Sequence, residues 1–127
     1  MHGELLKALC AACGARWPAP REMFATDCCP ECGETRTRPD VVWFGEKPYD
    51  MDLIERHVES ADLFASIGTS GQVFPAAAFV MQANAAGART VELNLEPSEL
   101  SGLFDDRIEG PATRVVPEWV ERLLADA

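Results

Sequence analysis

The feature that most constrains this chain is a pair of cysteine pairs near its start. Cys10 and Cys13 form one Cys-x-x-Cys pair, Cys29 and Cys32 form another, and fifteen residues separate the two pairs. Each Cys-x-x-Cys turn spaces two sulfurs for one tetrahedral ion, and two such turns complete a four-sulfur shell. A closed shell leaves no position for a substrate. The array therefore predicts a structural Zn²⁺ ion held by all four residues.

Two points about the cysteines have alternative interpretations. The four could be buried or redox-active residues that hold no metal. The fifth cysteine, Cys28, cannot form a Cys-x-x-Cys turn with Cys32, so Cys29 is the better ligand. We expect Cys28 to be a packed residue, and the alternative is a reactive, exposed thiol.

Composition places the chain among soluble globular proteins. It has 127 residues, of which 47% are hydrophobic and 25% are charged. We find no run near the roughly 20 apolar residues of a membrane helix and no signal-peptide pattern at the start, so we expect a cytoplasmic protein without a membrane partner. The formal charge of −10 argues against a nucleic-acid partner, because phosphate binding requires clustered Lys and Arg.

Short apolar runs alternate with helical patterns after residue 39, whereas residues 3 to 9 fit either a helix or a strand. This alternation predicts an α/β fold with a parallel sheet. The expected strands are 41–44, 63–67 and 90–93, and the expected helices are 51–61, 75–87 and one that begins at Pro117. The side chains expected to face inward from the helices are Ile54, Val58, Ala61, Phe79, Val80, Ala83, Val120, Leu123 and Leu124. The three tryptophans, Trp17, Trp43 and Trp119, are expected to be core or packing residues.

Parallel sheets bind ligands beyond the carboxyl ends of their strands. Gly45-Glu46, Gly68-Thr69-Ser70 and Asn94-Leu95-Glu96 occupy these positions. Small residues let backbone N–H groups approach a phosphate, and an acidic residue after a strand commonly holds a ribose diol. The alternatives are an ordinary glycine-rich loop and an ordinary capped turn.

Six motifs in a fixed order resemble the second half of the sirtuins, the NAD-dependent protein-lysine deacylases. They are His2-Gly3, the two cysteine pairs, the nine residues from Arg38 to Glu46, Gly68-Thr69-Ser70, Pro75-Ala76-Ala77, and Asn94-Leu95-Glu96-Pro97. The resemblance covers the whole chain, and is strongest to the bacterial and mitochondrial branch that includes desuccinylases. It implies half of a Rossmann-like NAD-binding sheet with flanking helices, formed by residues 1–9 and 39–127, and a small four-cysteine zinc-binding module at 10–38.

The resemblance also implies roles for individual residues. His2 matches the general base that draws a proton from the nicotinamide ribose after the acyl oxygen has attacked C1′, and the ordinary pKa of histidine suits that role. An acyl-lysine peptide would pair with Val42 to Glu46, with Val42 and Phe44 lining the acyl-lysine tunnel and the 70–74 stretch on the other side. The implied substrate-binding residues are Val42, Phe44, Gly45, Glu46 and Val73. The implied contacts of the co-substrate NAD⁺ are Gly68, Thr69, Ser70, Asn94, Leu95, Glu96 and Ala112, the last in a loop near the adenine.

The sequence departs from the family pattern ahead of the His-Gly motif. Sirtuins carry a glycine-alanine-glycine phosphate loop, the nicotinamide-pocket motif and three strands there, as well as the tyrosine-arginine pair with which desuccinylases hold acidic acyl groups. Acyl preference is therefore not readable from this sequence. We expect the chain to act with an amino-terminal half or with a second copy of itself. The alternative is a non-catalytic, zinc-containing binding or scaffold module.

Overall fold

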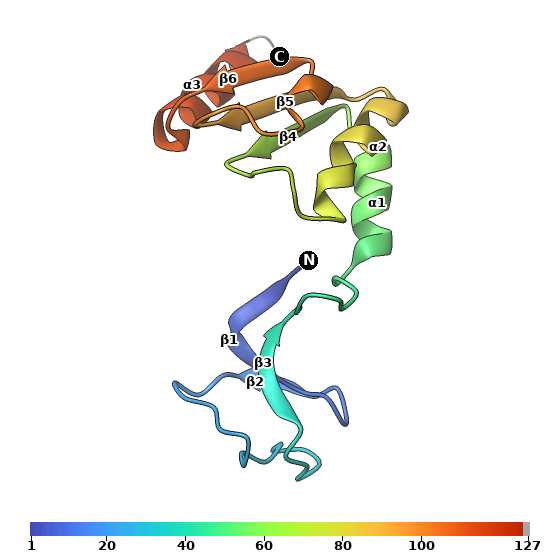
Figure 1. The fold of residues 1–127 in the computed structure, drawn as a ribbon, viewed down its shortest axis with the longest axis vertical. Coiled ribbons are helices and arrows are strands. Elements are labelled where there is room, and N and C mark those ends of the chain that lie inside the picture. The colour runs from blue at the N-terminus through green and yellow to red at the C-terminus, as the bar shows by residue number, and fades with distance from the viewer. Residues whose placement is uncertain (126–127) are drawn as a thin grey trace. The chain divides into compact units, whose positions relative to one another are not determined.

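The computed structural model describes residues 1–125, which belong to two compact units, Met1–Met51 and Asp52–Ala127 (Figure 1). Each unit contains one three-stranded sheet, antiparallel in the first and parallel in the second. The grouping of residues 1–9 with 39–127, made from the sequence, stays a prediction. The division at residue 51 arises because the strand before the cysteines pairs with the strand after them.

In the first unit, β1 (Gly3–Cys10) lies between β2 (Arg16–Pro18) and β3 (Thr37–Val41). Residues 3 to 9 are thus strand rather than helix. The β1–β3 register shifts between Glu4 and Ala8. Gly3 has φ +81°, and a Cβ atom there would lie 2.1 Å from the carbonyl oxygen of Asp40. Only glycine therefore permits β3 to approach the start of β1 so closely.

The buried strand expected at residues 41–44 is wrong. β3 ends at Val41, and the side chains of Trp43 and Phe44 are 53% and 100% exposed. Its partner β1 begins at Gly3, which pairs with Val41, so no strand continues the ladder beyond that point. The Val42 N–H still donates to a backbone carbonyl, at 2.9 Å, and the chain then turns. An apolar run without a pairing strand stays at the surface.

The second unit is the α/β part of the chain. Its elements are α1 (Met51–Glu59), β4 (Leu63–Ile67), the 3₁₀ turn η1 (Ala76–Ala78), α2 (Phe79–Ala86), β5 (Arg89–Asn94), the 3₁₀ turn η2 (Ser101–Leu103), β6 (Asp106–Glu109) and α3 (Ala112–Ala125). The sheet order is β4-β5-β6 and both strand pairs are parallel, which confirms the predicted sheet type.

The core of this unit forms around the central strand β5. Val91 and Leu93 pack with Val115 of α3, and Trp119 contacts the same cluster. The predicted inward face of α2 is confirmed, since Phe79, Val80 and Ala83 are all buried. The helix ends at Gly87, whose φ of +85° is the left-handed cap that glycine adopts readily. On α1, Val58 is buried and Ile54 is partly buried, whereas the partly buried Ala61 lies beyond the end of the helix at Glu59.

Two expectations for the carboxy-terminal part are wrong. The last helix begins at Ala112 rather than at Pro117, because the Pro111 carbonyl already accepts the N–H groups of Arg114 and Val115. The helix consequently buries Val115, whereas the side chains expected inward are exposed by 38%, 37% and 71% at Val120, Leu123 and Leu124. Strand β6 was not predicted, because its four residues carry no continuous apolar run.

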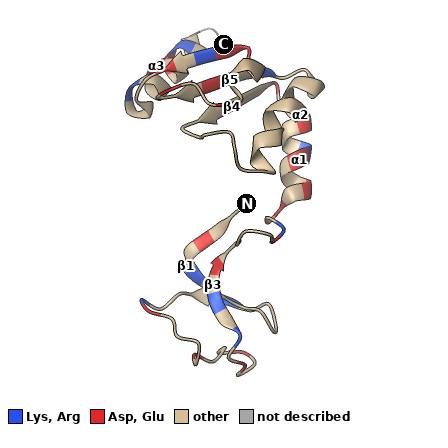
Figure 2. Cartoon of the chain, viewed as in Figure 1, with Lys and Arg blue, Asp and Glu red and all other residues tan. Residues whose placement is uncertain are grey.

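Strand β4 is less buried than its apolar sequence predicts. It lies at one edge of the sheet, with β5 on one side, and Ile67 is 45% exposed. Within residues 1–125, no helix has the length and apolar composition needed to cross a bilayer. Figure 2 shows both signs of charge along the strands and helices of each unit.

Candidate functional site

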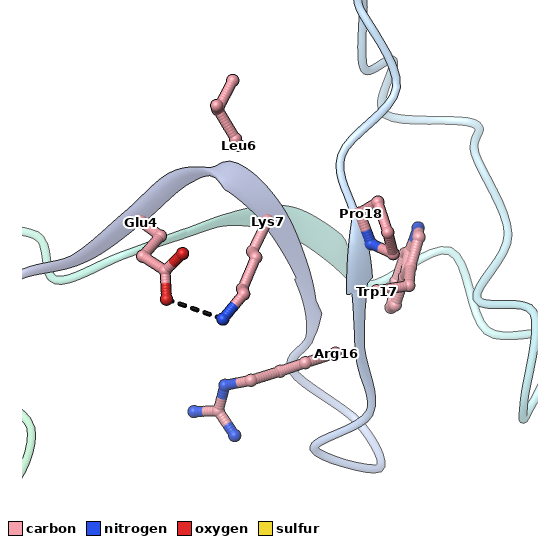
Figure 3. Close-up of a pocket in the computed structure, with 6 residues that line it drawn as sticks. All are labelled: Glu4, Leu6, Lys7, Arg16, Trp17 and Pro18. Carbon is pink, nitrogen blue, oxygen red and sulfur yellow. Dashed lines mark hydrogen bonds and ion pairs between the residues drawn. The ribbon is translucent and has the colours of Figure 1, made fainter.

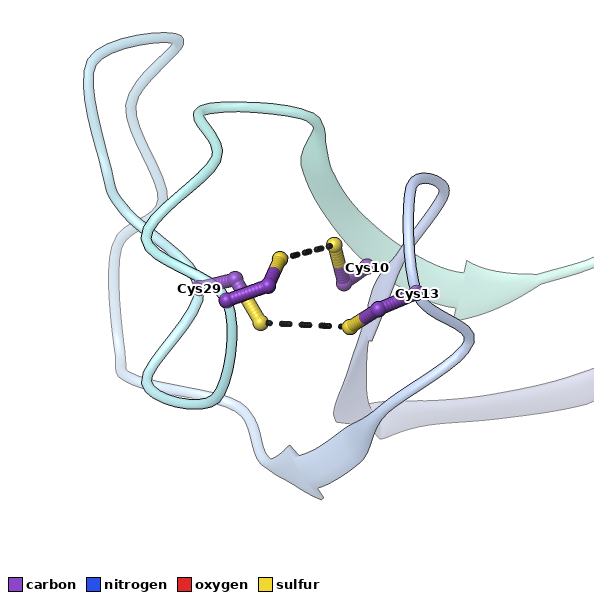
Figure 4. A group of neighbouring side chains, drawn as sticks. Cys10, Cys13 and Cys29 are labelled. Carbon is purple, nitrogen blue, oxygen red and sulfur yellow. Dashed lines mark hydrogen bonds between the residues drawn. The ribbon is translucent and has the colours of Figure 1, made fainter.

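The four paired cysteines lie in one cluster of the first unit (Figure 4). Their sulfurs are all within 4.8 Å of one another, and the Cys10–Cys32 and Cys13–Cys29 sulfur pairs are each 3.7 Å apart. A tetrahedral ion with metal–sulfur bonds of about 2.3 Å requires sulfur–sulfur edges of about 3.8 Å. The cluster therefore has the spacing of a four-thiolate metal site, with Cys10 and Cys29 buried beneath two exposed members.

The two cysteine turns have the same backbone geometry. Gly14 and Gly33 follow the second cysteine of each pair, both at φ +76°, and donate to the Cys10 and Cys29 carbonyls at 2.9 Å. Backbone N–H groups also point at sulfur, from Ala12 to Cys10 and from residue 31 to Cys29, both at 3.4 Å. N–H groups directed at sulfur stabilise thiolates. The repeated Cys-x-x-Cys-Gly sequence is the signal for this geometry.

The cluster does not ionise uniformly. Hydrogen bonding from the backbone of Cys13, together with that of Ala12, lowers the pKa of Cys10 to about 7. A backbone N–H of Glu34 favours the thiolate of Cys32, but burial and the neighbouring sulfurs outweigh it and raise the pKa of Cys32 to about 12. Several thiolates this close repel one another. Ionising all four requires a cation among them, which a divalent metal supplies.

Cys28 lies beside the cluster but is not part of it. Its thiol is exposed, with Sγ 3.8 Å from the carbonyl of Thr26. The expectation of a packed residue is therefore wrong, because the loop that carries Cys29 inward directs its neighbour outward.

A hollow of about 450 Å³ opens beside β1 and β2 of the same unit (Figure 3). Its charged groups are already paired: Lys7 donates to Glu4 at 2.6 Å, and Arg16 donates to the buried Asp40 at 2.8 Å. It contains none of the predicted site residues; its lining is Glu4, Leu6, Lys7, Arg16, the half-buried Trp17 and Pro18.

The predicted catalytic and peptide-binding residues of this unit lie together at the start of β1 and the end of β3. The His2 side chain is exposed, and its backbone carbonyl accepts the Val42 N–H at 2.9 Å. Phe44 is fully exposed in the turn that follows, and Gly45 has φ +87°. The Val42 backbone is thus anchored to His2, and two residues later the chain exposes the apolar side chain of Phe44.

Glu46 is bound to Arg38, a residue that the sequence argument did not single out although it opens the nine-residue motif. The Arg38 guanidinium donates to both carboxylate oxygens of Glu46, at 2.5 and 2.7 Å. This pairing, with a further hydrogen bond from the Trp43 N–H, lowers the pKa of Glu46 to about 2. Trp43 is not in the core; its ring lies 4.0 Å from the Arg38 guanidinium.

In the second unit, the predicted nucleotide-binding loops meet at the carboxyl edge of the sheet. Gly68 donates to the Leu93 carbonyl at 2.9 Å, and the Asn94 side chain donates to the Thr69 carbonyl at 2.8 Å. The Asn94 carbonyl accepts the Gly110 N–H at 2.9 Å, which brings the loop before α3 to the same edge.

The remaining predicted residues of this unit are exposed near these loops. Ser70, Leu95 and Glu96 are exposed, and Leu95 is 65% accessible. Ala112 was expected in a loop but is the first residue of α3. Val73 is 51% exposed and accepts the N–H of an η1 residue at 3.0 Å.

Sequence reasoning missed the residues that support these loops. The buried Glu92 accepts hydrogen bonds from the Ser98 N–H and the Ser101 hydroxyl, and so fixes the segment that follows Asn94. The fully buried Thr90 exchanges hydrogen bonds with Asp105, whose pKa these contacts lower. The sequence signal that could have found Glu92 and Thr90 was a polar residue within an otherwise apolar strand.

Comparison with known proteins identifies the family. The sequence profile of the Sir2 family matches residues 1–75, more than half of the chain. This chain belongs to the Sir2 family. The NAD-dependent protein deacylase of Caulobacter vibrioides is 53% identical to it over 126 residues, covering 98% of this chain and 53% of the relative. The Sir2 chain thus spans about half the length of the curated relatives it matches.

Solved Sir2 structures share its fold. A Sir2 homologue in complex with NAD has a TM-score of 0.85 and 32% identity, covering 98% of this chain and 50% of the homologue. A Sir2 protein bound to a myristoylated histone peptide has a TM-score of 0.73 and 30% identity, covering 99% of this chain and 58% of that protein. The sheet and the cysteine module of this Sir2 chain are therefore those of the family.

Proposed function

We propose that this chain is the acyl-lysine- and adenosine-binding part of an NAD-dependent protein-lysine deacylase. The observation that carries the proposal is the 53% identity to a protein deacylase over 98% of the chain, with the motif residues placed in two organised clusters. With one water consumed, the acyl-lysine and NAD⁺ would give the free lysine, nicotinamide and O-acyl-ADP-ribose.

The carboxyl edge of the parallel sheet is the proposed adenosine side of the NAD site. Loops that follow β4, β5 and β6 are tied together there by hydrogen bonds, while Ser70 and Glu96 remain exposed. In open α/β sheets ligands bind at this edge, where an acidic side chain can hold a ribose diol. Glu96 is our candidate for that contact.

The turn after β3 is the proposed binding segment for the acyl-lysine peptide. Phe44 exposes its entire side chain, so burying it against an acyl-lysine stem would contribute about 2 kcal/mol. A Sir2 protein of the same fold binds a myristoylated histone peptide, which supports a peptide substrate here. The acyl group preferred by this chain is not assigned.

His2 is the proposed general base. In the proposed reaction the acyl oxygen attacks C1′ of the nicotinamide ribose, the bond to nicotinamide breaks, and the imidazole accepts a ribose hydroxyl proton. His2 is exposed, and its imidazole makes no hydrogen bond within residues 1–125, so it is available to a ligand. Histidine is suited to this transfer because its ordinary pKa is close to neutral pH.

We further propose that the cysteine cluster holds one structural Zn²⁺ ion and that the protein works in the cytoplasm. The four-sulfur geometry and the absence of an open coordination position support a structural ion. Cysteines that gather as a possible metal site rather than as disulfides are typical of reducing compartments, which supports the proposed location.

Strand β4 is the proposed edge for association with an amino-terminal half or with a second copy. It is half-buried and has one paired neighbour, and exposed strand edges are normally covered in native proteins. A monodisperse 127-residue monomer at high concentration in light scattering would exclude self-association.

The activity is tested by joining this chain in frame to the remaining part of the Caulobacter relative. The joined protein should release nicotinamide from NAD in the presence of an acetyl-lysine peptide, and His2→Ala should abolish release without loss of bound metal. Cys28→Ser is the matched control and should retain activity. If the joined protein binds zinc and peptide but releases no nicotinamide, the non-catalytic module is the correct interpretation.

A further inference from the structure

The turn that follows β3 pairs with no strand. An arginine–carboxylate pair between two side chains holds it instead. Arg38 lies on β3, and its two terminal nitrogens donate to the two carboxylate oxygens of Glu46, eight residues later. The same guanidinium donates to the Val41 carbonyl at 2.9 Å. A bidentate arginine–carboxylate pair fixes direction as well as distance, because both groups are planar. The start and the end of the turn are thereby joined.

Glu46 makes a second set of contacts inside the turn. Its Oε2 atom accepts the Trp43 N–H at 2.9 Å, and its own N–H donates to the Trp43 carbonyl at 3.0 Å. The Trp43 ring lies 4.0 Å from the Arg38 guanidinium, so an indole that is 53% exposed is still held by cation–π contact. Both carboxylate oxygens of Glu46 are therefore occupied within the protein.

In this turn the backbone is fixed by hydrogen bonds, and one apolar side chain is exposed to solvent. Val42 is anchored to the His2 carbonyl, and Trp43 is anchored to Glu46. Phe44 lies between these anchors and Gly45, and its side chain is fully exposed. The Phe44 side chain is therefore available to a ligand.

We propose that Arg38 and Glu46 are positioning residues, which hold Val42 to Phe44 in the conformation that receives the acyl-lysine peptide. The inference rests on the proposed function. It changes the role of Glu46, which the family resemblance implied to be a substrate-binding residue. Glu46 acts through Arg38 and Trp43, and its carboxylate does not contact the substrate.

The test uses two variants and one control in the 127-residue chain. Arg38→Lys keeps the charge but loses the planar fork and the flat stacking on Trp43. Glu46→Gln keeps the size of the side chain but loses the ion pair. Asp106→Asn is the control, because it removes another arginine–carboxylate pair, with Arg89, whose shortest contact is 2.8 Å in the second unit.

Three properties are measured for each protein: bound zinc, amide hydrogen exchange at Trp43, and the Kd for an acetyl-lysine peptide against its unacetylated form. In Arg38→Lys and Glu46→Gln, we expect faster exchange at Trp43 and a Kd weakened about tenfold, equivalent to about 1.4 kcal/mol, at unchanged zinc content. The Asp106→Asn control should match wild type in all three.

Failure of the positioning role and failure of the proposed peptide site give different results. If hydrogen exchange at Trp43 becomes faster but peptide affinity stays within about twofold of wild type, the positioning role is overturned. The proposed function is then left intact. Loss of zinc in parallel with peptide affinity would assign the pair a structural role and also overturn it. If the wild-type chain binds the acetylated and the unacetylated peptide with the same Kd, the peptide site itself is refuted, before any variant is compared.

Discussion

Removal of zinc should unfold the first unit, because that unit has almost no other core. Its buried hydrophobic residues are Ala8, Cys10, Cys29 and Met51, and two of these are proposed metal ligands. A structural zinc site supplies about 10–16 kcal/mol of apparent binding free energy in small modules. That is comparable to the whole stability of a typical domain, about 5–15 kcal/mol. The antiparallel sheet should therefore not survive without the ion.

The assay is hydrogen exchange by mass spectrometry during titration with a chelator, with metal analysis on the same samples. Protein purified without chelator should contain about one zinc per chain. Chelation should remove exchange protection from β1, β2 and β3. Protection of β4 and β5 should persist, because their core forms around Val91, Leu93 and Val115 of the second unit.

Two neighbouring residues provide the matched comparison. Cys29→Ser should lose zinc and protection together, whereas Cys28→Ser should keep both, since the Cys28 thiol is exposed outside the cluster. A Cys29→Ser protein with a full zinc equivalent would refute the ligand set. Unchanged protection of β1 to β3 after complete metal removal would refute the argument from the missing core.

Three further predictions concern the first unit, each checked by chemical unfolding. Gly3→Ala should destabilise it by more than about 1 kcal/mol, because the new Cβ meets the Asp40 carbonyl, whereas Gly102→Ala, which meets nothing, should not. Asp40→Ala should lower the free energy of unfolding by about 1–3 kcal/mol, since it leaves an arginine and a tyrosine hydroxyl without their buried acceptor; a loss below about 0.5 kcal/mol would contradict this. Arg38 depresses the pKa of Glu46 to about 2, so the stability from this pair should be full above the ordinary glutamate pKa near 4.5 and disappear as pH falls to about 2. The stability difference between wild type and Glu46→Gln, followed across that window, should show this loss, and a pH-independent difference would contradict it.

Local patterns in the sequence determined much of the fold. The strands at 63–67 and 89–94 lie where short apolar runs end in glycine or asparagine. The α2 helix and its Gly87 cap follow from helical spacing and from the ability of glycine to adopt positive φ. The cysteine cluster was predictable for the same reason, because two residues between two cysteines fix the distance between their sulfurs within one turn. The spacing within each cysteine pair is local, whereas the meeting of the two pairs joins residues that are 16 and 22 apart in the chain.

Only the tertiary structure decided which apolar runs are buried and which charged residues are paired. The run from Val41 to Phe44 reads as a buried strand, but its partner β1 begins too late to continue the ladder, and Phe44 lies in solvent. The pairing of Glu46 with Arg38 was likewise not predicted from the sequence. Burial and ion pairing depend on residues that are distant in sequence and meet only in the folded chain, so spacing along the sequence cannot specify them.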